Sequence, residues 1–168
     1  MESLSIANCK VHILYMVKNA PEVSYQMLYD KCMESLYMDY FNFSQAYNDL
    51  LAGNLLSKVE TSSVDSINKL ESLTITKAGE AILEDVEDSL NPQTHAYLVK
   101  ASSELKNAVA YANSIKAIIE GSSVRLINSN IGLELTISCS SYEEATTIAN
   151  KWRKDAESLS SSIVNLIK

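Results

Sequence analysis

The spacing of apolar residues changes at residue 55, and this change limits the folds that the chain can adopt. Before it, apolar side chains recur every three or four positions in three stretches, which predicts three amphipathic helices. After it, two strand-like stretches flank a polar run at about 61–68, which predicts an antiparallel hairpin. The helices are expected at about 4–19, from Ser24 to about Leu36 and at about 43–52, with Met38–Asn42 as an aromatic connector, and the strands at Leu55–Glu60 and Leu70–Ile75.

A further helix is expected after the hairpin. Thr76 is a suitable N-cap, because its hydroxyl can accept a hydrogen bond from a main-chain N–H of the first turn. Three helices, a hairpin and a helix in this order predict a winged helix-turn-helix over residues 1–90, and an unrelated α+β domain is the alternative. The buried face of this helix is expected to carry Ala78, Ala81, Ile82 and Val86.

Residues 91–168 predict a second domain, which completes an α+β chain. Asn91-Pro92 is a typical helix start. The helix is expected to end near 107–112, and the alternative is that the same apolar face continues to Ile119. Apolar and polar residues alternate from Ile131 to Cys139, which is typical of a half-buried antiparallel strand. With strands expected at Ile115–Glu120 and Val124–Ile127, the pattern predicts a three-stranded antiparallel meander, followed by a long C-terminal helix.

The C-terminal helix is marked by a capping box, with Ser141 as the N-cap and Glu144 at the third helical position. From Ala145 to Leu166 the apolar residues are separated alternately by four and three positions, which is the spacing of a coiled-coil seam. The seam can cover the meander or close on the helix after Pro92. A helix ~40 Å long exceeds what three short strands can cover, so we expect a homodimer. Its contacts are expected at Trp152, Leu159, Ile163 and Leu166.

The acidic charge of the chain lies in its N-terminal part. Residues 1–90 contain six lysines, no arginine and 14 acidic residues, a balance of −8, whereas residues 91–168 contain eight basic and seven acidic residues, a balance of +1. Modules that bind nucleic acid usually carry a basic face. The balance therefore gives DNA binding no support, although a local basic patch is compatible with it.

Several motifs of the chain occur together in a known family. They are Met38–Asn42 before the third helix, Leu73–Gly79 after the hairpin, and Cys139–Ala145 leading to Asn150–Lys154 in the last helix. On these motifs, nearly the whole chain resembles a family of small Firmicutes proteins of unknown function with an N-terminal winged helix. The resemblance implies the winged-helix fold and a transcriptional regulator.

A winged helix that binds duplex DNA would present its third helix to the major groove. The expected helix contains no Lys or Arg, but Asn and Gln side chains can pair with adenine through two hydrogen bonds. Asp49, on the same helix, would repel phosphates if it pointed outward. The residues expected at a DNA interface are Asn42, Ser44, Gln45 and Asn48 for the bases, with Lys58, Lys69 and Lys77 for the phosphates.

Two other functions compete with DNA binding. The acidic balance of residues 1–90 favours a winged helix that binds a protein partner without DNA. The C-terminal meander and helix can alternatively hold a small apolar effector.

Catalysis and metal binding have little support in the sequence. His12 and His95 have no partner at metal-ligand spacing, and three cysteines without a C-x-x-C pair argue against a disulfide framework and a zinc site. No nucleotide-binding, hydrolase or metalloprotease motif occurs. We therefore expect neither an enzyme nor a cofactor. The chain also has no signal-peptide pattern and no apolar run of membrane-spanning length, so we expect a cytoplasmic protein.

Overall fold

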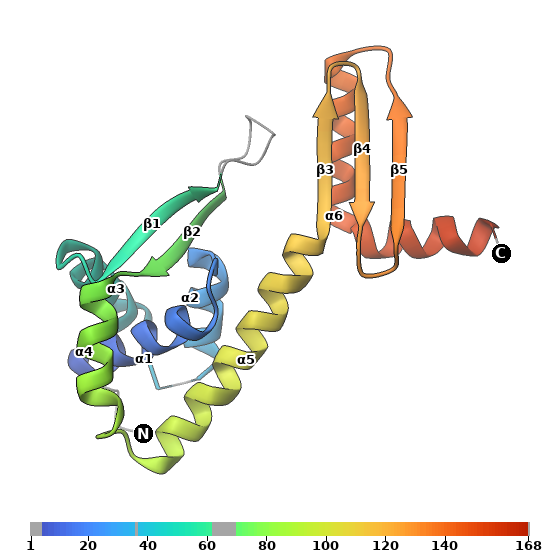
Figure 1. The fold of residues 1–168 in the computed structure, drawn as a ribbon. Coiled ribbons are helices and arrows are strands. Elements are labelled where there is room, and N and C mark those ends of the chain that lie inside the picture. The colour runs from blue at the N-terminus through green and yellow to red at the C-terminus, as the bar shows by residue number, and fades with distance from the viewer. Residues whose placement is uncertain (1–4, 36, 62–69, 168) are drawn as a thin grey trace. The chain divides into compact units, whose positions relative to one another are not determined.

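A computed structural model of the chain describes residues 5–35, 37–61 and 70–167 (Figure 1). By their contacts the described residues form two compact units, 5–61 with 70–109, and 110–167. The first unit thus includes most of a helix that the sequence analysis assigned to the second domain. The element order confirms the α+β fold: three helices, a two-stranded hairpin, two further helices, a three-stranded antiparallel meander and a long C-terminal helix.

The first three helices begin at the side chains of polar N-cap residues. Ser5, Ser24 and Asp39 each accept a hydrogen bond from the main-chain N–H three residues later. The expected connector at Met38–Asn42 is wrong in part, because the Asp39 carboxylate caps the third helix and draws the last three of these residues into its first turn. The helices are α1 (Ile6–Asn19), α2 (Tyr25–Glu34) and α3 (Tyr40–Ala52).

The hairpin consists of β1 (Leu56–Thr61) and β2 (Leu70–Ile75). The two strands pair antiparallel, from Leu56 opposite Ile75 to Thr61 opposite Leu70. The segment between α1 and α2 adds a short third pairing, because Leu73 donates its N–H to Val23 O at 2.8 Å and Ser24 bridges to Ser72. A hairpin extended in this way beside three helices is consistent with a winged-helix arrangement. The polar tip expected at 61–68 lies, apart from the main chain of Thr61, outside the described residues.

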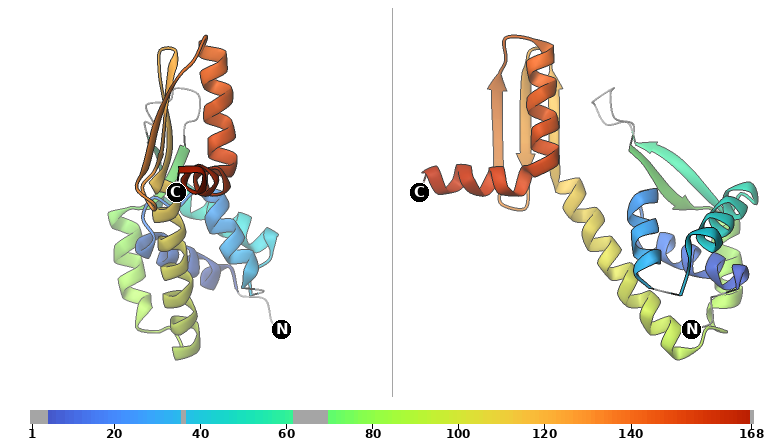
Figure 2. Two further views of the ribbon diagram at one scale, coloured as in Figure 1. Left: turned by 90° about the vertical axis from the view of Figure 1, so that its right-hand side faces the viewer. Right: turned by 180° about the vertical axis from the view of Figure 1, so that it is seen from behind.

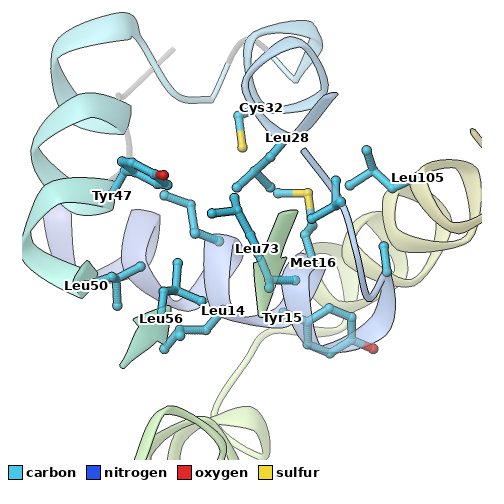
Figure 3. Close-up of a cluster of buried hydrophobic side chains, with 14 of the residues drawn as sticks. Leu14, Tyr15, Met16, Leu28, Cys32, Tyr47, Leu50, Leu56, Leu73 and Leu105 are labelled. Carbon is cyan, nitrogen blue, oxygen red and sulfur yellow. The ribbon is translucent and has the colours of Figure 1, made fainter. Parts of the chain in front are cut away.

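The core of the first unit lies between these helices and the base of the hairpin. Leu14, Leu28, Leu50, Leu56 and Leu73 come from five different elements and converge there (Figure 3). Helix α5 (Pro92–Ser114) contributes through Leu98, Ala101, Leu105 and Val109. It begins with Asn91 Oδ1 accepting from the N–H of Thr94 at 2.8 Å.

The buried face expected for α4 (Lys77–Glu87) is wrong by one position. Gly79 and Leu83 are buried and Val86 is half-buried, whereas Ala78, Ala81 and Ile82 are exposed. The reason is the glycine: a Cβ on Gly79 would overlap the main-chain oxygen of Leu55 and lie 2.9 Å from Ile75 Cγ1. The bare backbone at Gly79 therefore faces the hairpin, and this contact fixes the phase of the helix.

In the second unit, β3 (Ile115–Glu120), β4 (Ser123–Asn128) and β5 (Leu133–Ser138) form an antiparallel sheet in that order (Figure 1). Helix α6 (Tyr142–Ile167) packs on one face of the sheet, against β3 and β4. Val124 and Leu126 meet Ala145, Ala149 and Trp152 there. The expected half-burial of the last strand is wrong for Ile137, which is exposed, because α6 packs chiefly on the other two strands.

Helix α6 bends at Asp155, whose backbone is not helical (φ −144°, ψ 37°), and Figure 2 shows the two parts running in different directions. The helix that carries the expected seam is therefore not straight, although Leu159 and Ile163 beyond the bend still pack against the core of the unit. At the start of the helix, Ser141 Oγ accepts a hydrogen bond from Glu144 N–H, as expected for an N-cap. In a capping box the Glu144 carboxylate would accept from the N–H of Ser141, but here it accepts from the N–H and hydroxyl of Ser140, one residue earlier. No helix in the described part of the chain is long and apolar enough to span a membrane.

Candidate nucleic-acid interface

The outward face of α3 carries exposed apolar and amide side chains, with the exposed Asp49 at its border. Phe41, Gln45 and Asn48 are exposed at helical spacing, so they lie on one side of the helix, opposite the buried Phe43, Ala46 and Leu50. The structure thus brings Gln45 and Asn48 together on an accessible surface.

The other two polar residues expected on this surface are less available. The Asn42 side chain donates from Nδ2 to Asp39 Oδ2 at 3.2 Å, next to the bond from its main-chain N–H to Asp39 Oδ1. Ser44 is half-buried. Asn42 therefore completes the cap of α3, and Gln45 and Asn48 remain the polar residues best placed for an external ligand.

Asp49 does not present a bare negative charge on α3. Its carboxylate forms an ion pair with Lys10 of α1, with Nζ 2.7 Å from Oδ2. The pair uses a cation of the same unit to neutralise the carboxylate that would repel DNA phosphates.

The lysines expected to contact DNA phosphates differ in whether a carboxylate already pairs with them. Lys58 on β1 pairs with Glu71 on β2 at 3.0 Å, and this carboxylate raises the pKa of Lys58. Lys77, at the start of α4, is exposed, and no ion pair to it occurs among the described residues. Lys69 lies outside the described residues. Lys31 of α2 also pairs with carboxylates, those of Glu34 and Glu104.

The hairpin is fixed to the helices by Thr76 and Gly79. The Thr76 hydroxyl donates to Asn54 O at 2.8 Å and accepts from Gly79 N–H at 3.1 Å, and Thr76 N–H donates to Leu55 O at 3.1 Å. These bonds tie the end of β2 to the segment that follows α3. The position of the hairpin relative to the outward face of α3 is thereby set.

An aromatic cluster adjoins the outward face of α3, and its residues are not among those expected at the DNA interface. Tyr25 and Tyr29 of α2 stack with ring centroids 6.2 Å apart, and Tyr25 meets Tyr47 of α3 edge-on at 4.9 Å. At the start of α3, Tyr40 is exposed and Phe41 is 79% exposed. Placing the start of α3 three residues earlier would have put Phe41 on the face of Gln45 and Asn48.

The residues expected at a dimer interface occupy three environments. Trp152 is 1% exposed in the core of its own unit, and Leu159 and Ile163 are half-buried against the same core. Leu166 is 86% exposed. Of the four, Leu166 is therefore the one with most surface left for a partner.

Metal-binding groups do not gather in the described part of the chain. No cluster of three His, Cys, Asp or Glu side chains there could hold a metal ion. Burial raises the pKa of Cys32 to about 12 and lowers that of His12 to about 4. Both side chains are thus held neutral in the core of the first unit.

Comparison with known families gives one match. The family model described as a domain of unknown function (DUF4364) matches residues 9–167. No curated protein matches the chain, and no solved structure does. Since the match covers both units from α1 to the end of α6, the chain belongs to the DUF4364 family.

Proposed function

We propose that this protein is a transcriptional regulator whose first unit binds duplex DNA as a winged helix, with α3 in the major groove. The observation that carries the proposal is the outward face of α3, where Gln45 and Asn48 are exposed beside Phe41 and the nearby Asp49 is neutralised by Lys10. Amide side chains can hydrogen-bond to adenine, and an apolar side chain can contact a thymine methyl group.

The arrangement of lysines implies weak general attraction to DNA. Lys58 and Lys31 are already paired within the unit, so each would exchange a carboxylate for a phosphate on binding. Phosphate contacts supply most non-specific affinity and its dependence on salt. Affinity for a preferred sequence would then come largely from base contacts, and the salt dependence would be shallow.

The DNA proposal predicts separate effects for the two kinds of residue. Gln45→Ala or Asn48→Ala should weaken binding to a selected site by ~1–3 kcal/mol and leave random DNA nearly unaffected, because each removes a base contact. Lys77→Ala should weaken all sequences alike and lower the salt slope by about one unit. Asn107→Ala, an exposed amide on α5, is the control.

Fluorescence anisotropy with a site selected from genomic fragments measures these effects. Electrostatic attraction is strongest at low ionic strength. If the wild-type protein does not associate with genomic or random fragments at about 50 mM salt, the DNA proposal is wrong.

The second candidate function is a winged helix that binds a protein. Two observations favour it: the pairing of the lysines, and the exposure of Tyr25, Tyr37, Tyr40 and Phe41 around α2 and α3. Aromatic residues are enriched where protein interfaces gain most of their affinity. A photo-crosslinking residue at position 41, with position 107 as the control, distinguishes the two functions in cells by whether the adduct contains DNA or protein.

A further inference from the structure

The two edges of the sheet in the second unit differ. At the β3 edge, Arg153 of α6 donates from Nη2 to Ala117 O at 3.0 Å. In an antiparallel pair, every second residue directs its main-chain N–H and C=O groups toward the neighbouring strand. Because Ser129 N–H donates to Ser114 O, the residues of β3 that bond to β4 are the even-numbered ones, and the main-chain groups of Ala117 point away from β4. Arg153 therefore occupies an outward main-chain oxygen of this edge.

The β5 edge has no such occupant in the described part of the chain. Cys139 N–H donates to Ser122 O at 2.7 Å and so continues the β4–β5 ladder. By the same alternation, the residues whose main-chain groups bond to β4 are Leu133, Leu135 and Ile137. The main-chain groups of the alternate residues, Glu134, Thr136 and Ser138, point outward. An edge of this kind without proline or lysine is a template for a further strand.

The side chains of β5 divide into an apolar and a polar set. The apolar set consists of Leu133, Leu135 and Ile137. It lies on the same face of the sheet as α6, but α6 covers that face mainly over β3 and β4. Ile137 is therefore exposed, and both leucines are only half-buried. The opposite face carries Glu134 and Thr136, and Glu134 pairs with Arg125 of β4 at 3.6 Å. A strand added beside β5 must therefore be apolar on the first face and polar on the second.

We propose that this strand is β5 of a second copy, paired antiparallel about a two-fold axis at Thr136. In this register Thr136 faces Thr136, and Glu134 faces Ser138, so all three outward residues exchange both main-chain hydrogen bonds with one another. On the apolar face Leu135 faces Ile137, and Leu133 faces Cys139. A register centred on Glu134 would instead place two carboxylates opposite each other.

The end of α6 supports the same partner. After Asp155 the helix passes the lower ends of β4 and β5, and its C-terminal end extends beyond β5 (Figures 1 and 2). There Leu166 is 86% and Ile167 76% exposed. Because the second copy continues the sheet beyond β5, these side chains would lie on the side of the sheet where the second copy is placed. The proposal concerns the second unit alone and does not depend on DNA binding.

Charge pairing at position 136 tests the proposal. The wild-type protein should sediment with twice the mass of the 18.5 kDa chain. Thr136→Lys and Thr136→Glu should each give monomers, because like charges would face each other across the axis. An equimolar mixture of the two variants should recover the dimer. Thr147→Lys, which adds the same charge at an exposed position of α6, should remain dimeric.

Trp152 fluorescence verifies that each variant is folded, since this tryptophan lies in the core of the unit. A wild-type mass near 18.5 kDa overturns the proposal, and so does a Thr136→Lys protein that stays dimeric. A register shifted by two residues would place position 136 opposite Glu134, and the lysine variant would then dimerise more tightly than wild type, which also contradicts the assignment. Recovery on mixing excludes general destabilisation by the substitutions.

Discussion

At Gly79 the main chain of α4 lies against the main chain of Leu55, with no room for a side chain between them. Thr76, three residues earlier, both caps α4 and donates to Asn54 O. The Thr-x-x-Gly motif after the hairpin thus has a local physical meaning. The hydroxyl fixes where the helix begins, and the glycine lets the helix approach the strand. Both residues thereby position the hairpin against the helices.

His12 makes the stability of the first unit depend on pH. Burial lowers its pKa in the folded chain from 6.5 to about 4, so between these values the unfolded chain binds a proton that the folded chain does not. The free energy of unfolding should therefore fall as the pH decreases from 6.5 to 4, by about 3 kcal/mol from this residue. Above pH 6.5 His12 should contribute no pH dependence.

Urea unfolding of the wild type and His12→Phe across this pH range measures the effect, since carboxylates contribute to both proteins and cancel in the difference. If the difference in unfolding free energy does not change with pH, His12 is not held neutral by burial.

In helix α4, two neighbouring apolar residues differ strongly in burial, so their substitutions test the phase of the helix. Leu83 is fully buried, whereas Ile82 is 44% exposed. Leu83→Ala should lower the free energy of unfolding by about 2–5 kcal/mol through lost burial and the cavity left behind. Ile82→Ala should change it by less than about 0.5 kcal/mol. Equal effects in chemical unfolding would contradict the observed phase of the helix.

The sequence predicted the order of elements because helix and strand periods differ and polar residues mark most helix starts. Residue spacing alone did not predict the phase of α4, since Ala78 and Ile82 are as apolar as the residues that are buried, and the contact between Gly79 and Leu55 joins distant segments. The bend at Asp155 was missed because the four-three spacing continues through it. In the candidate interface, the predicted placement of Gln45 and Asn48 on α3 agrees with their exposure, while the place of Phe41 on the same face depends on the cap that Asp39 provides.

At the scale of the whole molecule, each unit has its own apolar core, and the only tryptophan, Trp152, lies in the second. Fluorescence of Trp152 should therefore follow unfolding of the second unit, whereas far-ultraviolet circular dichroism follows both. Leu83→Ala should shift the dichroism transition and leave the fluorescence transition in place. A shift of both by the same amount would show that the units unfold as one.

The bond from Arg153 to Ala117 O has a consequence for how far such a sheet can grow. In the proposed dimer, the β3 edge already has one outward oxygen, Ala117 O, bonded within its own chain, which leaves the β5 edge more open to a second copy. Association through a single self-complementary edge closes at two copies. A chain with both edges free would add copies at either end and polymerise, as strands do in cross-β fibrils. In the proposed dimer, the Arg153 guanidinium group would therefore favour a finite assembly over an open-ended one.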